Sequence, residues 1–382
     1  MDIITIITII FWVSLFLIFW TYFGYLLILG LLSLFFTKKV NRQDYYPEVS
    51  LIITAYNEEK RIKQKIENTL ALSYPKEKLD IIVVSDGSTD RTEEIISQFQ
   101  SRGVRLHSIP SRHGKHYGQN EGIKIAKYDI LVFTDAATFL ENNAIEKISR
   151  NFADSKIGCV SGFDKIKGDD NNIQGEGAYV KYEMILRTLE SAVDSLIGVS
   201  GSFFAIRKHL CNNWPIHLSS DFFTPIITYM NGFRIILEKE AIGYYEVLQQ
   251  PEKEFIRKVR TIVHGMSVFF KFRRIANPFR YGTYSIQVLT HKLSRWLVPI
   301  YLIMFFLSNL LLINQHLIFI AVFIAQVVFY ALALFASLNK KLKDTIFFKI
   351  PLFFVMVNYS ILVAWYYFFR GERFIVWKPT ER

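Results

Sequence analysis

Acidic side chains follow the apolar runs in the middle of this 382-residue chain. Asp86 comes directly after the run at 81–85, and Asp135 comes directly after the run at 130–134. Short β-branched runs of this kind are typical of strands that are buried on both faces. Ligands of an open parallel sheet bind beyond the carboxyl ends of its strands, so we expect these carboxylates to meet at one edge. Carboxylates gathered there suit a sugar hydroxyl, the edge of a nucleobase or a divalent cation that holds a diphosphate.

The elements that would position these side chains alternate along the chain. Polar stretches with helical periodicity separate the β-branched runs, which predicts an α/β fold with a largely parallel sheet and right-handed crossovers. The expected strands are 50–54, 81–85, 130–134 and 157–161, and the expected helices are 58–72, 90–100 and 141–152. The sequence contains neither a GxxxxGK[ST] loop nor a GxGxxG turn, so an ATPase or a dinucleotide-binding protein is not indicated.

Apolar blocks at both ends of the chain predict transmembrane helices. Residues 3–36 carry no charge, and this run is too long for the apolar part of a cleaved signal peptide. It suits one span with an overhanging end. Three further blocks, at 296–313, 317–338 and 350–369, each have the length that a bilayer requires.

Basic residues place the middle of the chain in the cytoplasm. Lys38, Lys39 and Arg42 directly follow the first span, and such residues collect on the cytoplasmic side. The loop at 339–349 carries four Lys against one Asp and is expected on the same side. One crossing at the start and three at the end would put the basic tail at 371–382 outside. Either one block lies in the membrane interface, or the tail is an exception to the rule.

Composition and charge narrow the class of protein. The net charge is +11, but the hydrophobicity is concentrated in blocks, so the basic residues favour anionic lipid or phosphate over nucleic acid. Cys159 and Cys211 lack metal-ligand spacing, which indicates a reduced compartment and no structural metal site. The expected segments are a transmembrane helix at 1–37, a cytoplasmic domain at 38–253, an amphipathic interfacial helix region at 254–290, about three transmembrane helices at 291–370 and the tail at 371–382.

The segment at 254–275 combines apolar residues at helical spacing with a cluster of basic side chains. A helix of this kind, just before a membrane block, is expected in the plane of the lipid headgroups. Its basic residues Arg257, Lys258 and Arg260 could bind lipid phosphate or the diphosphate of a substrate. Both uses are compatible if the helix covers an active site at the membrane surface.

Seven motifs in order resemble those of membrane-bound glycosyltransferases of family 2, which include poly-N-acetylglucosamine, hyaluronan and cellulose synthases. The motifs are TAYNEE at 54–59, VVSDGSTD at 83–90, GKHYGQNEGI at 114–123, FTDAAT at 133–138, GVSGSFFAIRK at 198–208, SSDFFTP at 219–225 and FIRKVRTIVHG at 255–265. The resemblance covers nearly the whole chain. It implies a GT-A-type, Rossmann-like cytoplasmic domain that binds a nucleotide sugar, usually a UDP-sugar.

The resemblance also implies roles for individual residues. Asp221 matches the general base of the family, and Asp135 begins the stretch that matches the DxD motif, where a carboxylate supports Mg²⁺ or Mn²⁺. Contact with the donor is implied for Thr54, Tyr56, Glu58, Asp86, Lys115, Asp135, Arg257, Lys258 and Arg260. A position facing the acceptor is implied for Gly198, Ser200, Gly201 and Ser202.

The chemistry of sugar transfer is consistent with these roles. Asp221 would accept the proton of the attacking acceptor hydroxyl, which gives inversion in a single displacement. A metal ion with Lys or Arg would stabilise the charge that develops on the leaving diphosphate. The alternative for Asp221 is a structural one, the N-cap of the helix that follows Ser219 and Ser220.

Three residues depart from the family pattern. Ala137 stands where the DxD motif has its second Asp, Ser220 replaces the Glu before the base, and Thr261 stands where processive synthases have the Trp that stacks on the acceptor. We therefore expect an inverting glycosyltransferase of the cell membrane that moves a sugar from a nucleotide donor to a lipid-linked or glycan acceptor, in polysaccharide or glycoconjugate biosynthesis. The alternatives are a processive synthase that secretes its polymer, alone or with a partner subunit, and an inactive membrane scaffold with the same fold.

Overall fold

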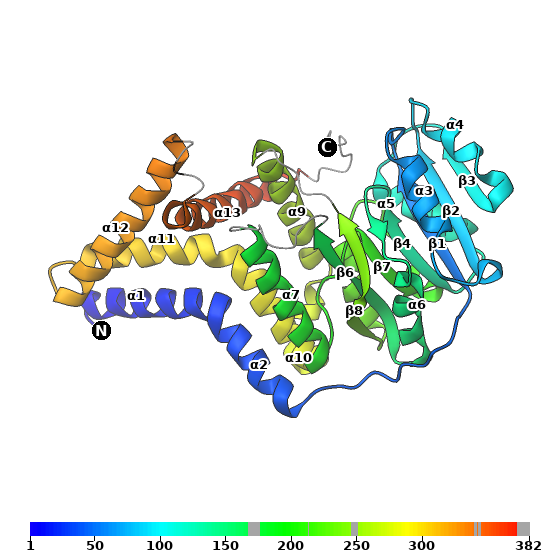
Figure 1. Ribbon diagram of the computed structural model, residues 1–382. Helices are drawn as coiled ribbons and strands as arrows, with labels where there is room; N and C mark the ends of the chain where they lie inside the picture. Colours follow the sequence, from blue (N-terminus) through cyan, green and yellow to red (C-terminus); the bar gives the residue numbers. More distant parts are fainter. Residues whose placement is uncertain (167–175, 213, 246–250, 340–341, 343–344, 373–382) are drawn as a thin grey trace.

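The architecture was described from a computed structural model. The structure describes residues 1–166, 176–212, 214–245, 251–339, 342 and 345–372. Most of the basic tail expected at 371–382 lies outside these residues. Figure 1 shows a sheet flanked by helices at one end of the molecule and a group of long apolar helices at the other, with α7, α9 and α10 between them.

Within the described residues, eight strands form one mixed sheet in the order β3-β2-β1-β4-β7-β6-β8-β5. Their bounds are β1 Val49–Ala55, β2 Leu79–Asp86, β3 Val104–Ile109, β4 Ile130–Asp135, β5 Phe139–Leu140, β6 Ile157–Ile166, β7 Phe203–Arg207 and β8 Arg234–Tyr245. The first four strands of this order are parallel, whereas β7 runs antiparallel to both β4 and β6. The four predicted strands are present, and the predicted α/β class with a mostly parallel sheet is confirmed.

Helices α3 to α8 lie between strands of the sheet, whereas α1 and α2 precede the first strand and α9 to α13 follow the last. The helices are α1 Ile3–Phe19, α2 Tyr25–Phe35, α3 Ile62–Leu70, α4 Thr92–Ser97, α5 Lys115–Ile125, α6 Ala144–Ser149, α7 Glu176–Val193, α8 Ser220–Met230, α9 Pro251–Lys271, α10 Pro278–Val288, α11 Arg295–Leu312, α12 Leu317–Leu338 and α13 Ile346–Phe369. The three helices predicted between strands are present but shorter than expected. Asn57, directly before the first of these predicted helices, has a φ of 52°, so the chain forms a turn there before α3 begins.

The two faces of the sheet belong to different hydrophobic clusters. Leu51 and Ile53 of β1 point to the cluster that contains α3 and α6. Ile52 of the same strand points to the other cluster, which contains α5 and α8 and continues through Met266 of α9 and Tyr284 of α10. Alternate residues of a strand face opposite sides, so β1 is buried on both faces. One continuous core therefore fixes the sheet against the helices that lead to the membrane segments.

Among the described residues, four helices are long and apolar enough to cross a membrane: Ile3–Phe35, Pro278–Leu312, Leu317–Leu338 and Phe347–Phe369. The span at 278–312 begins earlier than the predicted block at 296–313, because α10 continues into α11 through a π-helical turn, η7 (Leu289–Ser294). A second π-helical turn, η1 (Trp20–Gly24), joins α1 to α2. Candidate spans at both ends of the chain agree with the prediction.

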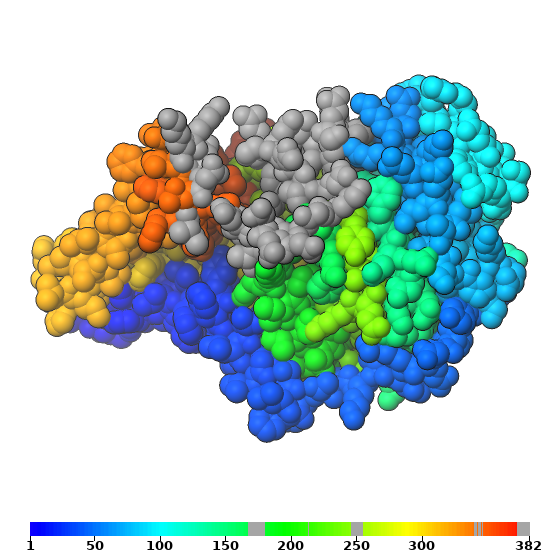
Figure 2. Space-filling view, viewed as in Figure 1, coloured from blue at the N-terminus to red at the C-terminus, as the bar shows by residue number. Residues whose placement is uncertain are grey.

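The N-terminal helix takes part in two packing groups. Phe11 of α1 contacts Phe305 of α11 and Phe319 of α12, with ring centroids 4.9 and 5.1 Å apart. Figures 1 and 2 accordingly show the blue α1 beside the yellow and orange helices at one end of the molecule. Beyond η1, the chain bends away, and Tyr25 and Leu29 of α2 pack against α7. The overhanging end of the predicted span is therefore α2, which contacts the domain that carries the sheet.

Candidate active site

A cavity of about 1230 Å³ lies at the carboxyl ends of β1, β2 and β4 and extends to α1, α9, α11 and α13. Its lining includes twelve of the predicted site residues: Thr54, Tyr56, Glu58, Asp86, Lys115, Asp135, Ser200, Gly201, Ser202, Asp221, Arg257 and Lys258. Gly198 and Arg260 are not among the lining residues. Side chains from distant parts of the sequence are therefore brought to one site.

Hydrogen bonds to Asp86, at the end of β2, hold the loop of His113 and Gly114 in place; we call this arrangement the Asp86 clamp. Both carboxylate oxygens of Asp86 accept backbone hydrogen bonds, from the amides of His113 at 2.9 Å and Gly114 at 2.6 Å. Gly87 has a φ of +68°, and a Cβ there would lie 2.5 Å from the amide nitrogen of Arg112, so this close approach requires glycine. The clamp holds the Arg112 guanidinium 3.8 Å from the centre of the Tyr56 ring. Arg112 was not predicted from the sequence, although a cation over an aromatic ring suits a site for an anionic nucleotide.

Lys115 and Asp135 form the centre of the site. The Lys115 ammonium lies 2.5 Å from Asp135 Oδ1 and donates a hydrogen bond to the carbonyl of Gly201 at 2.8 Å. The backbone amide of Asp135 donates to the carbonyl of Ser202 at 3.1 Å. The first residue of α5, the end of β4 and the loop before β7 are thus joined, and the cation and the carboxylate remain about one-third exposed to the cavity.

A lysine beneath this centre was missed by the sequence analysis. Lys65 of α3 is fully buried, and its ammonium donates to Thr134 Oγ1 at 3.0 Å and to the carbonyl of Thr138. Burial lowers the pKa of Lys65 to about 7, against a smaller opposing effect of Asp135. The two threonines flank Asp135, so Lys65 supports the segment that carries this carboxylate.

Asp221 lies in the first turn of α8. The structure places Ser219 at the N-cap of this helix, and Asp221 is therefore not the cap residue. The Ser219 hydroxyl donates to Asp221 Oδ1. A Cβ on Gly201 would lie 3.5 Å from the Asp221 Cβ, which shows how closely the predicted acceptor loop approaches the predicted base.

Asp164 of β6 is a further lining residue that the sequence analysis missed. Its Oδ1 accepts hydrogen bonds from Ser200 Oγ at 2.7 Å and Ser202 Oγ at 3.0 Å, and Arg187 lies 3.8 Å from its Oδ2. Burial raises the pKa of Asp164. A weaker sequence signal was present, because Asp164 comes three residues after the end of the apolar run at 157–161, whereas Asp86 and Asp135 follow their runs directly.

The basic residues of α9 differ in their access to the cavity. Arg257 and Arg260 are three residues apart and share one side of the helix, but only Arg257 is among the lining residues. Arg257 and Lys258 line the cavity, and the Lys258 ammonium also lies 5.3 Å from the centre of the Phe353 ring of α13. Burial, with a contribution from Arg257, lowers the pKa of Arg260 to about 10, so its guanidinium stays charged at neutral pH. Arg257 and Lys258 therefore offer positive charge to the cavity.

The acidic residues fit a divalent cation in part. Asp135 is exposed to the cavity, but Ala137 offers no second carboxylate. Over the described ranges, no group of three or more His, Cys, Asp or Glu side chains could hold a metal ion. Magnesium sites commonly use one or two carboxylates and take further oxygens from the phosphates of the substrate. The residues therefore fit a cation that arrives with a nucleotide diphosphate.

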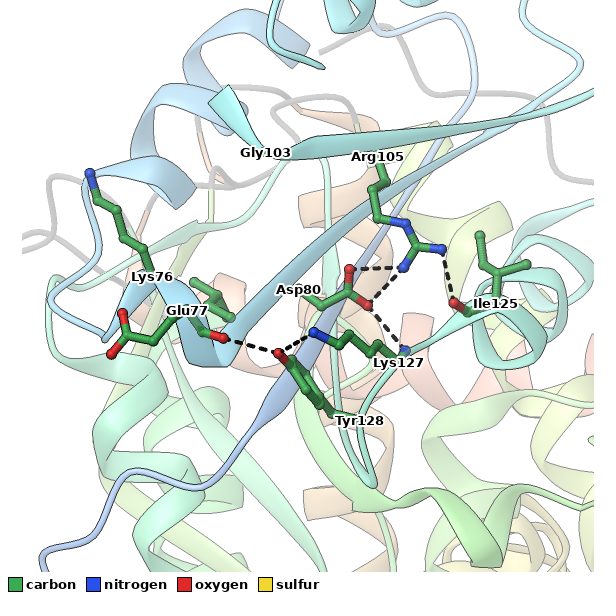
Figure 3. A pocket seen from close by; sticks show the side chains of 9 residues that line it. Lys76, Glu77, Asp80, Gly103, Arg105, Ile125, Lys127 and Tyr128 are labelled. Carbon is green, nitrogen blue, oxygen red and sulfur yellow. Dashed lines mark hydrogen bonds and ion pairs between the residues drawn. The ribbon is translucent and has the colours of Figure 1, made fainter. Parts of the chain in front are cut away.

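A second pocket, of about 530 Å³, lies near the amino ends of β2 and β3 and is shown in Figure 3. Asp80 accepts hydrogen bonds there from Arg105 Nη1 at 2.9 and 3.0 Å and from the backbone amide of Lys127 at 3.1 Å. The Lys127 side chain donates to the hydroxyl of Tyr128 at 2.9 Å. Asp80, Arg105, Lys127 and Tyr128 are joined by these hydrogen bonds, and the pocket is at the edge opposite to the predicted site.

Comparison with known proteins agrees with this geometry. Residues 50–214 match the model of the family described as glycosyl transferase family 2. These residues form a glycosyltransferase family 2 domain, so the predicted enzyme class is confirmed.

Individual relatives extend the similarity beyond this domain. The poly-beta-1,6-N-acetyl-D-glucosamine synthase of Staphylococcus aureus (strain COL) is 24% identical over 299 residues, which cover 74% of this chain and 71% of the relative. The enzyme of the same name from Staphylococcus epidermidis is 29% identical over 168 residues, covering 42% and 39%. The solved mannosyltransferase PcManGT from Pyrobaculum calidifontis, in complex with GDP-Man and Mn²⁺, has a TM-score of 0.72 at 19% identity and covers 95% of this chain and 99% of its own. The last similarity supports the predicted GT-A-like fold.

Proposed function

We propose that this protein is an inverting glycosyltransferase that moves a sugar from a nucleotide donor, in the first instance a UDP-sugar, to a lipid-linked or glycan acceptor at the cytoplasmic face of the cell membrane. The observation that carries the proposal is the shared cavity, which joins Asp135, Lys115 and Asp221 and continues to helices that are suited to a membrane. Lys38, Lys39 and Arg42, after the first candidate span, favour the cytoplasmic side.

The residues at the strand ends would bind the donor. Tyr56 and Arg112 would face the nucleoside, and the hydrogen bonds of Asp86 would hold the loop of Arg112 in place. Lys115 would neutralise the diphosphate that leaves when the bond to the anomeric carbon breaks, since charge develops there in the transition state. Arg257 would add a second positive charge from α9 on the other side of the cavity.

Asp221 would act on the acceptor. Its carboxylate would accept the proton of the acceptor hydroxyl while the oxygen forms a bond with the anomeric carbon and the nucleotide diphosphate departs from the opposite face. The Ser219 hydroxyl, which donates to Asp221 Oδ1, would orient this carboxylate. The loop of Ser200, Gly201 and Ser202 would let the acceptor approach the backbone closely.

Asp135 would hold Mg²⁺ or Mn²⁺ together with phosphate oxygens of the donor. The chemistry that the cation supplies is neutralisation of the leaving diphosphate. PcManGT was solved with GDP-Man and Mn²⁺, which supports a divalent cation in this fold. With Ala137 in place of a second Asp, Lys115 would carry a larger share of this neutralisation.

A panel of UDP-sugars, with GDP-mannose beside them, tests the proposal. Full-length protein in a neutral detergent is assayed for release of nucleotide diphosphate, with and without EDTA. We expect one donor to be turned over by the wild-type protein, with a decrease in EDTA that added Mn²⁺ or Mg²⁺ restores. Failure to bind or turn over any nucleotide sugar would overturn the proposal.

A processive synthase is the second candidate, because a poly-beta-1,6-N-acetyl-D-glucosamine synthase is similar to 74% of this chain. Thr261, in place of the stacking Trp, lines the cavity and offers no aromatic surface to a growing chain. Product length separates the two candidates. A product with one added sugar supports single transfer, whereas a long polymer supports the synthase. A synthase that requires a second subunit would make polymer in native membranes but not as the purified protein.

A further inference from the structure

The cavity has a second arm that the proposed donor site does not use. Beyond Asp221 it extends between α1 and α13, where its lining consists mostly of hydrocarbon and phenyl groups, among them Ile18, Phe23, Phe353, Val357 and Ile361. A glycan in such an arm would need polar partners for its hydroxyl groups, because buried polar groups without hydrogen bonds are costly. A hydrocarbon chain needs none, so the apolar arm favours a lipid tail.

A cation lies where the apolar arm meets the catalytic end of the cavity. Lys292 of η7 lines the cavity, and its ammonium lies 5.5 Å from the centre of the Phe222 ring. In the part of the chain that the structure describes, this ammonium has no ion-pair partner within 4.0 Å. A positively charged group at the depth of the membrane helices marks a site for an anion.

Two carboxylates near Lys292 bind other residues, although Glu190 Oε2 has no hydrogen-bond partner within the described ranges. Glu183 of α7 pairs with Arg295 and lies 3.2 Å from His291. Glu190 lies 2.7 Å from the other ring nitrogen of His291 and accepts a hydrogen bond from Tyr25 at 2.8 Å. Among the described residues, neither Glu183 nor Glu190 pairs with Lys292, so the Lys292 ammonium is available to a ligand.

Lys292 is close to the predicted base. A Cβ on Gly198 would lie 3.9 Å from Lys292 Nζ and 3.8 Å from the backbone oxygen of Asp221, so the lysine and Asp221 flank the same glycine. An anion held by Lys292 would place the group attached to it beside the Asp221 carboxylate.

The backbone conformation supports a functional role for the junction, by which we mean the place where Lys292 and Asp221 flank Gly198. Lys292 is in the π-helical turn η7, and Tyr22 and Phe23, on the opposite wall of the arm, are in the π-helical turn η1. The two turns are joined by the hydroxyl groups of Thr21 and Ser294, which are 2.5 Å apart. Single π-helical turns within α-helices occur frequently at functional sites.

We propose that the acceptor is an anionic lipid whose phosphate binds Lys292, whose hydrocarbon chain occupies the arm between α1 and α13, and whose headgroup hydroxyl faces Asp221. This inference rests on the proposed function and specifies its acceptor. The headgroup oxygen forms the bond to the anomeric carbon, its proton passes to Asp221, and the nucleotide diphosphate leaves with the electron pair of the broken bond. The glycosylated lipid then keeps its tail in the apolar arm.

A photoreactive alkyl phosphate tests this site directly. The probe has a twelve-carbon chain with a diazirine near its end and is irradiated with full-length protein in maltoside micelles. We expect crosslinks in the segments at 18–23 and 350–361, and we expect dodecyl phosphate to displace the probe. Displacement to the same extent by dodecyltrimethylammonium would show a hydrocarbon site without a phosphate site, and displacement by inorganic phosphate alone would show a free-phosphate site. Either result overturns the inference.

Variants of the junction and the arm sharpen the test. Lys292→Gln should decrease crosslinking about tenfold, since hydrogen bonds to charged groups are the strong ones, and Lys292→Arg should retain most of it. Lys124→Gln is the matched control, because Lys124 is exposed on α5 and pairs with Glu121 at 2.6 Å. Val357→Trp should block the arm, whereas Val327→Trp, on the exposed side of α12, should not.

The two proposals fail in different ways. Unchanged labelling in both Lys292→Gln and Val357→Trp would overturn the lipid-phosphate site while release of nucleotide diphosphate from the donor still supports the transferase. Absence of donor binding and turnover in the wild-type protein would overturn the proposed function, whatever the probe labels. Size-exclusion profiles and thermal unfolding show which variants are folded, and Lys292→Arg keeps the test valid if Lys292→Gln does not fold.

Discussion

Asp80, near the amino ends of the strands, and Asp135, at a carboxyl end, are both paired with a cation but differ in what else they bind. Asp80 is 6% exposed and accepts hydrogen bonds from Arg105, from the Ser50 hydroxyl at 2.9 Å and from the amide of Lys127. Asp135 is 35% exposed, and its carboxylate lies 2.5 Å from Lys115. The oxygens of Asp80 are occupied by protein donors, whereas Asp135 can exchange its partner for a ligand.

This difference shows which charged residues can take part in chemistry. A buried carboxylate that is saturated by hydrogen bonds stabilises the fold, because removal of one partner leaves a desolvated charge. A cation and a carboxylate that face a cavity together can separate when a diphosphate and its cation bind. We therefore propose that Asp80 contributes to the stability of the sheet and that the cluster of Asp135, Lys115 and Asp221 takes part in transfer. Substitutions at the two edges should have opposite consequences.

Asp221→Asn should have the largest effect on activity. The amide has nearly the shape of the carboxylate but cannot accept the proton of the acceptor, and general base catalysis contributes roughly 10²–10⁴-fold to the rate. We expect kcat to decrease by about this factor with an unchanged unfolding temperature. Asp154→Asn, at a carboxylate outside the cavity, serves as the matched substitution. Normal turnover by the Asp221→Asn enzyme would remove Asp221 from the mechanism.

Lys115→Met should affect donor binding next most strongly. The substitution removes the ammonium beside Asp135, and a hydrogen bond to a charged group contributes about 1.5–3 kcal/mol, which corresponds to roughly 10–100-fold in affinity. Calorimetric titration with the donor identified in the panel measures this change. Lys124→Gln, nine residues further along the same helix, should bind the donor like the wild-type protein. Equal affinity in the two variants would contradict the role of Lys115.

Lys65→Met should change the pH dependence of stability and decrease activity only several-fold. Burial lowers the pKa of Lys65 in the folded protein to about 7, whereas the ordinary value is 10.5. Between these values the unfolded chain binds a proton that the folded chain does not, so the free energy of unfolding rises with pH. The variant should lose this rise. Thermal unfolding of both proteins between about pH 7 and pH 10 measures the difference, and parallel curves would show that Lys65 does not titrate in this way.

The strands and the edge that carries the site could be predicted from local sequence. The β-branched runs at 50–54, 81–85, 130–134 and 157–161 are buried on both faces, so their composition is unambiguous. In contrast, β3 is an edge strand that alternates polar with apolar residues, and β8 contains Glu238, Lys239 and Glu240. Both strands were missed because their composition depends on neighbours that the sequence does not show.

The site residues divide in the same way. Asp86 and Asp135 follow their strands directly, so chain order alone brought them to one edge. Lys65 looks like a solvent-exposed lysine in an amphipathic helix, and only the packing of α3 under β4 places it beneath the site. Lys292 belongs to an apolar span far along the chain, and its contact with the cavity depends on how α11 packs against the catalytic domain. Residues whose place in the cavity depends on their position along a strand could be predicted. Residues whose place in the cavity depends on the packing of helices could not.

Asp80→Asn should have the smallest effect on transfer and a clear effect on stability. The substitution keeps the shape of the side chain but weakens the pair with Arg105 and leaves buried donors imperfectly matched, which costs about 1–3 kcal/mol. The pocket in Figure 3 is at the opposite edge of the sheet, so kcat and KM should remain near those of the wild-type protein. A lower unfolding temperature with unchanged turnover confirms the comparison. A large loss of turnover in a folded Asp80→Asn variant would instead show that the two edges of the sheet are coupled, and the separation of stability from catalysis would no longer hold.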